Sequence, residues 1–459
     1  MSFHLGKPVL VMLLIALVSG TMVASRSVEP RRDLVFWVFA VSHAEIYRSQ
    51  SPQIPSLIEQ FRRKYGQSVR VNLINGRALD TRLLSLMMSG ATGDKVPDVV
   101  KLEINSIGKY FRFPPEKVGL LPLDEFIDRD GLRGELLPAR LAPWTRGGKV
   151  FGIPHDVHPV SLTYRKDLYD AAGVDLAQCT TWDQFHAAAL EYQRYWSANG
   201  HPERSAVEMP RLSGGIVERL LLQRGINLVD SDLHTHLTDP RVADTLVRYS
   251  EMVAGERRIG ADASPGGFNW VGDLRRGAIG AFLTADWRVT YIRLHAGDEL
   301  PGKLAMMPLP IFEPGDRPTS TWGGTMAGIP RNARDPEASW RVIRHFVLSP
   351  EGLEARRRRS DVLPPMRSSW NHPDLHRPDP LFGGQYVGEL FCRLAEQVPE
   401  FHATPFTTTA SMLMNQVLYE QTVQVDHGRP RAERLEQARR RLAEQDAYLR
   451  RIIRFTAFE

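Results

Sequence analysis

The hydrophobic positions of the chain predict short buried strands that alternate with amphipathic helices. Residues 34–41 form a continuous apolar run rich in aromatic and β-branched side chains, which is typical of a buried strand. Apolar residues recur at spacings of three and four from Ile54 to Tyr65, and Gly66 follows, which predicts a helix with a glycine end. The next elements predicted are a strand at 69–74, a helix at 79–88 and a strand that starts at Pro97.

A second series of elements begins near Lys149, after the turn predicted at Gly147 and Gly148. Thr181 and Gln184 have the spacing of a capping box, which predicts a helix that runs to about Trp196. The other elements predicted are strand, loop and strand over 149–164, strands at 278–283 and 304–309, and helices at 215–224, 241–254, 336–348 and 433–453. This alternation predicts an α/β fold with mainly parallel sheets, whose ligand crevices lie at the carboxyl ends of the strands.

The length and the charge of the chain narrow the classes of protein to which it can belong. A chain of 459 residues exceeds what one hydrophobic core usually supports, so we expect two lobes or domains. The net charge is +5, and basic runs occur at 356–359 and 439–441. Both runs lie in helix-like sequence and the excess charge is spread along the chain, so we interpret them as solvated helix faces and expect no nucleic-acid partner.

The first 25 residues predict export. Lys7 precedes an apolar run from Val9 to Val18, and small residues continue to Ser25, which is the pattern of a cleavable signal peptide over 1–25 and of a periplasmic protein. An uncleaved anchor over 8–24 remains open, whereas no later stretch reaches 18 consecutive apolar residues. The chain has two cysteines, Cys179 and Cys392, which we expect to be unpaired thiols.

Several segments, in the same order along the chain, carry a resemblance to a known family. They are FRRKYGQSVRV at 61–71, LLSLMMSGATGDKVPDVVKLE at 83–103, VGLLPLDEFI at 118–127, GGKVFGIPHDVHPVSLTYRKDLYDAAGVD at 147–175, GAIGAFLTADW at 277–287, and the stretch from GKLAMMPLPIF to RHFVLSPEGL at 302–353. Each segment alone is weak, but their collinear order is specific. The chain thus resembles the extracellular solute-binding proteins of the sugar-type ABC importers, the group that includes the maltose-binding protein.

The resemblance implies a two-lobed periplasmic-binding-protein fold of type II with a multi-strand hinge. By this similarity the first lobe comprises 32–145 and 328–370, and the second comprises 146–327 and 371–459. Hinge closure on a small polar ligand, which we expect to be a mono- or oligosaccharide, would then present the closed form to a membrane permease. The resemblance further implies a monomer with no metal, no cofactor and no catalytic residues, and Ala327, Gly328 and 362–365 are candidates for the hinge.

A sugar-binding site needs aromatic side chains that stack on the apolar faces of the sugar ring and polar groups that bind its hydroxyls. By family alignment and by residue type, the candidate ligand-binding residues are Ser42, His43, Asn105, Asp156, His158, Tyr164, Asp286, Trp287, Trp322, Gly323, Gly324 and Arg367. The carbohydrate assignment rests on Trp287, Trp322 and Tyr164, although each ring can equally serve as ordinary packing. Arg165 stands where the family often has Asn, so the ligand's identity is not carried over.

Other functions remain open at this stage. The same fold can bind a polyol, a phosphorylated polyol or a polyamine, and an exported carbohydrate-active enzyme would need a carboxylate pair such as Asp156 and Asp286. The sequence contains no G-x-S-x-G, H-E-x-x-H, P-loop or C-x-x-C pattern. In HDVH, His155 and His158 point to opposite faces if the segment is extended, which argues against a shared metal.

Overall fold

The computed structural model describes residues 33–264 and 268–456, together with residues 6, 12 and 15. The predicted signal peptide therefore lies almost entirely outside the described residues. Within the described part, no helix combines the length and the apolar content that crossing a bilayer requires. Cys179 and Cys392 are free, the first buried and the second partly exposed.

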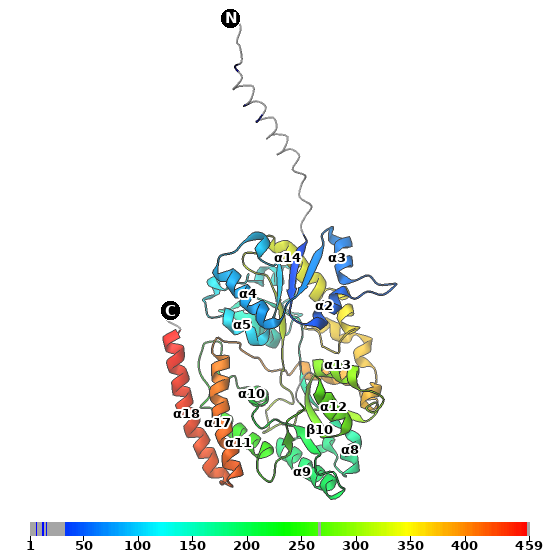
Figure 1. Ribbon diagram of the computed structural model, residues 1–459, viewed down its shortest axis with the longest axis vertical. Coiled ribbons are helices and arrows are strands. Elements are labelled where there is room, and N and C mark those ends of the chain that lie inside the picture. Colours follow the sequence, from blue (N-terminus) through cyan, green and yellow to red (C-terminus); the bar gives the residue numbers. More distant parts are fainter. Residues whose placement is uncertain (1–5, 7–11, 13–14, 16–32, 265–267, 457–459) are drawn as a thin grey trace.

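Two five-stranded sheets form the centres of an upper and a lower lobe (Figure 1). The first sheet has the order β2-β1-β3-β12-β6, the second has the order β11-β7-β10-β8-β9, and β4 and β5 form a separate hairpin. The strands are β1 (Leu34–Val38), β2 (Val69–Leu73), β3 (Val99–Glu103), β4 (Thr145–Arg146), β5 (Lys149–Val150), β6 (Ile153–Pro154), β7 (Val160–Arg165), β8 (Ser205–Glu208), β9 (Gly260–Ala261), β10 (Ile279–Ala285), β11 (Leu304–Pro308) and β12 (Thr325–Gly328).

Helices cover both sheets, and the last two helices form a long antiparallel pair along one side of the lower lobe (Figure 1). The helices are α2 (Val41–Arg48), α3 (Leu57–Tyr65), α4 (Gly76–Met88), α5 (Ile104–Tyr110), α6 (Asp124–Arg129), α7 (Pro138–Leu141), α8 (Lys166–Ala171), α9 (Trp182–Ala198), α10 (Gly214–Gln223), α11 (Pro240–Val253), α12 (Asn269–Arg276), α13 (Asp286–His295), α14 (Pro336–Ile343), α15 (Pro350–Arg357), α16 (Val387–Ala395), α17 (Thr407–Asp426) and α18 (Arg431–Thr456).

The predicted α/β class is confirmed, but both sheets are mixed in direction and not mainly parallel. Strand β1 runs parallel to β2 and β3, whereas β12 runs antiparallel to β3 and β6. In the second sheet β7 runs antiparallel to both β10 and β11. The cause is topological, because β7 and β12 each enter their sheet from the opposite lobe and run away from the junction.

Strand pairing moves two of the predicted lobe boundaries. Ile153–Pro154 pairs with β12, and Thr325–Gly328 pairs with β3, so both segments belong to the first sheet although the sequence placed 146–327 in the second lobe. Ala327 and Gly328 accordingly lie within a strand of the first sheet and not in a segment that connects the two lobes. The chain passes between the sheets at 155–159, at 309–324 and after α15. The other predicted lobe boundaries remain predictions.

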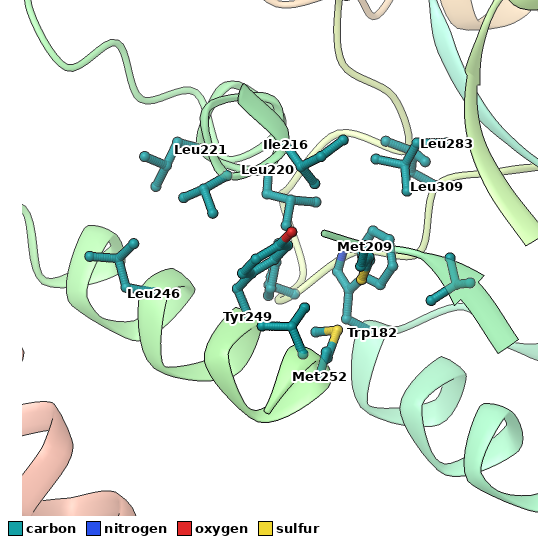
Figure 2. Packing of buried hydrophobic residues seen from close by; sticks show 14 of the residues in the cluster. Trp182, Met209, Ile216, Leu220, Leu221, Leu246, Tyr249, Met252, Leu283 and Leu309 are labelled. Carbon is teal, nitrogen blue, oxygen red and sulfur yellow. The ribbon is translucent and has the colours of Figure 1, made fainter. Parts of the chain in front are cut away.

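The buried apolar residues form a separate core in each lobe. In the lower lobe α9, α10 and α11 pack against the second sheet, and Figure 2 shows Trp182, Leu220 and Tyr249 facing one another there. The predicted capping box is present at the start of α9, where the Thr181 hydroxyl accepts from the Gln184 N–H at 3.2 Å. A purely local pattern was sufficient to fix this helix start.

Helix α2 was missed because the apolar run of residues 34–41 does not end where the strand ends. Val38 pairs with Leu73, the last residue of β2, and the chain then turns into α2 at Val41. The side chains of His43 and Tyr47 in this helix are buried. The helix therefore places polar groups directly beyond the carboxyl end of β1.

Replacement of Gly108 by Ala tests the contact between α5 and the segment that leads into α17. A Cβ at Gly108 would lie 2.4 Å from the Thr404 carbonyl oxygen, so the backbone must shift. We expect Gly108→Ala to lower the free energy of unfolding by about 1–3 kcal/mol in urea titrations. Gly272→Ala is the matched control, because a Cβ there would meet only the flexible Arg276 side chain, at 3.1 Å. An equal loss of stability in both variants would contradict this packing.

Candidate functional site

A cluster of buried charged side chains lies where the two lobes meet. It contains Lys101, Arg140, His155, Asp156, His158, Asp286 and Arg356. These residues come from β3 and α7 of the first lobe, from the first crossing, from the start of α13 in the second lobe and from α15. Burial of so many charges requires close pairing, because an unpaired charge in a low-dielectric interior is strongly destabilising.

His158 links the lobes through both of its ring nitrogens. Its Nδ1 lies 2.5 Å from Asp286 Oδ1, and its Nε2 lies 3.0 Å from Asp156 Oδ2. The backbone of His158 is left-handed, with a φ of 58°, a conformation that non-glycine residues rarely adopt. The unusual backbone thus coincides with the residue that has to face two carboxylates at once.

The same network reaches all three crossings. Arg140 donates from Nη2 to Asp156 Oδ1 at 2.9 Å and from Nη1 to the Thr321 hydroxyl, in the second crossing, at 2.8 Å. The N–H of Leu363, in the third crossing, donates to Asp286 Oδ2 at 2.8 Å. The two carboxylates therefore fix the relative positions of the three segments.

The charges of this network shift the pKa values of its members in opposite directions. Burial alone would lower the pKa of His158, but the nearby Asp156 and Asp286 outweigh it and raise the pKa to about 9. Burial alone would raise the pKa of Asp156, but His158, Arg140 and the Thr325 N–H bring it well below its ordinary value. At neutral pH His158 is therefore an imidazolium between two carboxylates.

A second group of basic side chains packs behind this network. His155 Nδ1 lies 2.9 Å from Lys101 Nζ and 2.8 Å from Arg356 Nη2, so it accepts from both and the ring is neutral. Burial and then the charge of Arg356 lower the pKa values of Lys101 and His155 well below their ordinary values. The ring of His43 lies 4.9 Å from that of His155, and burial lowers the pKa of His43 as well.

Two tryptophans lie beside the network and remain partly exposed. The rings of Trp287 and Trp322 meet edge to face with centroids 5.7 Å apart, and Trp287 Nε1 donates to the Trp322 carbonyl oxygen at 3.0 Å. Gly323 follows with a φ of 94°, and a Cβ there would lie 3.4 Å from His158 Cδ2 and 3.7 Å from Trp287 Nε1. These would be ordinary contacts, so it is the positive φ, which residues with a side chain rarely adopt, that favours glycine at this position.

The two tryptophans differ in what covers their rings. The guanidinium groups of Arg219 and Arg288 lie 4.3 and 5.2 Å from the centroid of Trp322. Among the described residues, no cation lies over the ring of Trp287. Trp287 is consequently the more available platform for the apolar face of a ligand.

Polar side chains of the first lobe lie at the end of β3, which meets the loop that carries Trp322. The N–H of Ile104 donates to the Gly324 carbonyl oxygen at 2.9 Å, which brings the end of β3 against the glycine pair. Glu103 and Asn105 are exposed there, and Asn105 Nδ2 lies 3.4 Å from Glu103 Oε1. Sequence reasoning missed Glu103, although its place directly after a buried strand was a usable signal.

The structure brings together only some of the predicted ligand-binding residues. Ser42 is exposed and His43 is buried at the start of α2. The predicted residues that gather at the junction are Asn105, Trp287, Trp322, Gly323 and Gly324. Asp156, His158 and Asp286 lie there too, but they are buried and bind one another. We call Glu103, Asn105, Trp287, Trp322 and Gly323 the junction rim.

Tyr164 and Arg367 lie away from the junction rim. Tyr164 is 4% exposed in the core of the second lobe, where it packs edge-on against Tyr169 with centroids 5.7 Å apart. It is the penultimate residue of β7 and pairs with Ala281, four residues before the end of β10, so it lies toward the side of the sheet that faces away from the junction. Arg367 is on the surface, and its guanidinium pairs with the Glu396 carboxylate at 3.0 Å.

The HDVH stretch does not form a metal site in this geometry, because His155 faces Lys101 and Arg356 while His158 faces the two carboxylates. Within the described residues, one group of three side chains lies close enough together to hold an ion, namely Asp230, Asp232 and His234. It lies on a partly exposed loop of the second lobe, outside the charged network.

The pH dependence of unfolding, measured with and without the His158 imidazole, tests the charged network. The folded-state pKa of about 9 lies above the ordinary value of 6.5, so protonated His158 stabilises the fold fully below pH 6.5 and this contribution is lost as the pH rises through about 9. We expect urea unfolding of the wild type to lose on the order of 3 kcal/mol between pH 6 and pH 10, and the profile of His158→Gln to be flatter by that amount.

The matched control for this experiment is His201→Gln, because His201 is exposed and lies against one carboxylate, that of Glu203, and the edge of Trp196. Its pH profile should follow that of the wild type. Asp286→Asn, which removes one carboxylate partner and keeps the ring, should flatten the profile in part and serves if His158→Gln fails to fold. Parallel profiles for the wild type and for both junction variants would show that His158 is not charged in the fold.

Comparison with known proteins agrees with this architecture. Residues 56–381 match the family model described as bacterial extracellular solute-binding protein. An arabinooligosaccharide-binding protein of Bacillus subtilis is 24% identical over 355 residues, which cover 75% of each chain, and a lactose-binding protein of Rhizobium radiobacter is 22% identical over 334 residues, which cover 72% of this chain and 75% of that one.

Solved structures extend the likeness to nearly the whole chain. The sugar-binding protein MalE from Xanthomonas citri superposes with a TM-score of 0.72 at 20% identity, covering 92% of this chain and 99% of that one. A transporter-associated binding protein of B. animalis in complex with beta-1,6-galactobiose has a TM-score of 0.66 at 18% identity, with 91% and 98% covered. These likenesses establish the fold, and because the family model spans most of the described residues, the chain belongs to the bacterial extracellular solute-binding proteins.

Proposed function

We propose that the chain is the exported solute-binding component of an ABC importer and that it captures a mono- or oligosaccharide at the junction rim. The observation that carries this proposal is the partly exposed Trp287 at the meeting point of the lobes. Its neighbour Trp322 is followed two residues later by Gly324, against which the end of β3 lies with the exposed Glu103 and Asn105. An open aromatic face beside carboxylate and amide groups is the combination that a pyranose or furanose requires. The names of the relatives, arabinooligosaccharide-binding and lactose-binding, support the same class of ligand.

The aromatic part of the site is smaller in this proposal than the sequence suggested. Tyr164 is enclosed in the core of the second lobe, and guanidinium groups lie against Trp322. Trp287 therefore serves as the stacking surface, and Trp322 fixes its position through the carbonyl oxygen that accepts from Trp287 Nε1. Arg367 has no part in the site, because it pairs with Glu396 on the surface.

Capture and delivery follow from the way the lobes are joined. The three crossings are bound to one another by buried charges, so relative motion of the lobes is confined to a few dihedrals close to this network. In the proposed cycle the protein acts as a monomer in the periplasm after removal of its signal peptide. Closure on the ligand then creates the combined surface of both lobes that a permease recognises.

Binding without turnover is favoured over an exported hydrolase by the state of the two candidate carboxylates. Hydrolysis of a glycosidic bond needs two carboxyl groups on either side of an open cleft. Asp156 and Asp286 are 1% and 0% exposed and are both bound to His158. Release of new reducing ends from a panel of oligosaccharides would overturn the binding proposal.

Titration calorimetry with arabinooligosaccharides, galactobiose and lactose tests both the class of ligand and the role of Trp287 as the stacking surface. We expect one saccharide to saturate the wild type at one-to-one stoichiometry, and Trp287→Ala to weaken it about tenfold, since an aromatic contact contributes up to about 1.5 kcal/mol. The control is Trp196→Ala, because Trp196 is also partly buried but lies on α9 under the Arg204 guanidinium, at 3.8 Å.

The outcomes separate the parts of the proposal. Equal affinity in the wild type and in Trp287→Ala would place the ligand elsewhere. A response to polyols, phosphorylated polyols or polyamines, with none to saccharides, would keep the family and change the ligand class.

A further inference from the structure

Helix α18 exposes a basic and aromatic face that the proposed capture of a solute does not use. Residues 431–456 contain eight arginines and four acidic residues. One side of the helix is buried against the second lobe through Ala438, Leu442 and Leu449, each at most 1% exposed. The opposite side runs along the outside of the molecule, and its carboxyl end rises beside the upper lobe (Figure 1).

The exposed side of α18 carries arginines and two large aromatic rings on the same helical face. Arg440, Ala447, Tyr448, Arg451, Arg454 and Phe455 recur at spacings of three, four and seven, which places them on one helical face. Tyr448 is 51% exposed and Phe455 is 72% exposed. We call these six residues the α18 outer face.

Glu433, Glu436 and Glu444 lie on the same side of α18 as Arg440, whereas no acidic residue lies in the last part of the helix, residues 447–456. Glu444 pairs with Arg441, and the buried Asp446 pairs with Arg450 at 2.7 Å. Within the described part of the chain, Arg440, Arg451 and Arg454 form neither an ion pair nor a side-chain hydrogen bond. The part of the α18 outer face from Ala447 to Phe455 therefore carries two arginines, Arg451 and Arg454, that no acidic residue of the helix offsets.

The other basic run singled out from the sequence is different, and the contrast is informative. Arg356 is buried in the junction network, and Arg357 and Arg358 both pair with Glu354. That run is explained by the fold. In the run 439–441, Arg441 pairs with Glu420 and Glu444, whereas Arg439 and Arg440 form no ion pair among the described residues.

We propose that the α18 outer face binds an anionic lipid surface. Arginine guanidinium groups pair with lipid phosphates, and a tyrosine and a phenylalanine one or two turns away insert their rings at the boundary between headgroups and acyl chains. Exposed aromatic rings favour a lipid interface over nucleic acid, whose backbone needs only the positive charge. Because α18 lies along the outer side of the second lobe, this contact leaves the junction rim accessible to a solute.

Sedimentation with vesicles tests the lipid contact, using the protein purified after export. We expect binding to vesicles of phosphatidylglycerol and phosphatidylcholine at low salt, little binding to phosphatidylcholine alone, and weakening as salt is added. Each arginine near an anionic surface raises the affinity roughly fivefold, so Arg451→Gln with Arg454→Gln should lower the partition coefficient about 25-fold. Phe455→Ser should lower it as well, and this loss should persist at high salt.

The control removes the same charge from the first lobe through Arg70→Gln with Arg112→Gln, two exposed residues that form no ion pair among the described residues. This control should bind vesicles as the wild type does, and circular dichroism and saccharide affinity should be unchanged in every variant. Absence of binding to anionic vesicles, an equal loss in the control, or binding only when a permease is present in the vesicle would each overturn the proposal. None of these results depends on whether a saccharide binds at the junction rim.

Discussion

The contact of His158 with Asp156 and Asp286 is the interaction on which the arrangement of the two lobes depends. Two carboxylates buried at the same junction would repel each other and would be poorly solvated. The imidazolium between them resolves both problems, and Arg140 and the Leu363 N–H satisfy the remaining carboxylate oxygens. Because the five groups come from both lobes and from two of the crossings, the lobes cannot separate here without exposure of unpaired charge.

This constraint explains several local features that otherwise look unrelated. His158 adopts a left-handed backbone, and Gly323 adopts a φ of 94° beside its ring. The conformation of His158 is unfavourable by about 1 kcal/mol or more for a residue with a side chain, so the surrounding contacts must hold it in place, whereas glycine adopts a positive φ readily. The strong pairing at the junction is the source of that compensation, and Trp287 gains a fixed orientation from the same loop.

The sequence predicted the elements whose cause is local and failed where the cause is long-range. The strand at 69–74 and the start of α9 follow from alternation and from a capping box, and both are present. Tyr164 was assigned to the site by alignment, yet only the pairing of β7 with β10 reveals that it faces the core. The ion network joins residues as far apart as Asp156 and Asp286, which no spacing along the chain could indicate.

The same distinction separates the aromatic residues that can meet a ligand from those that cannot. A ring inside a sheet is covered by helices on both faces, whereas a ring just beyond a strand end can face the crevice. Trp287 is the second residue of α13, directly after β10, and Glu103 is the last residue of β3. Their availability therefore comes from the position at which each strand stops, and the buried charges keep those two strand ends facing each other.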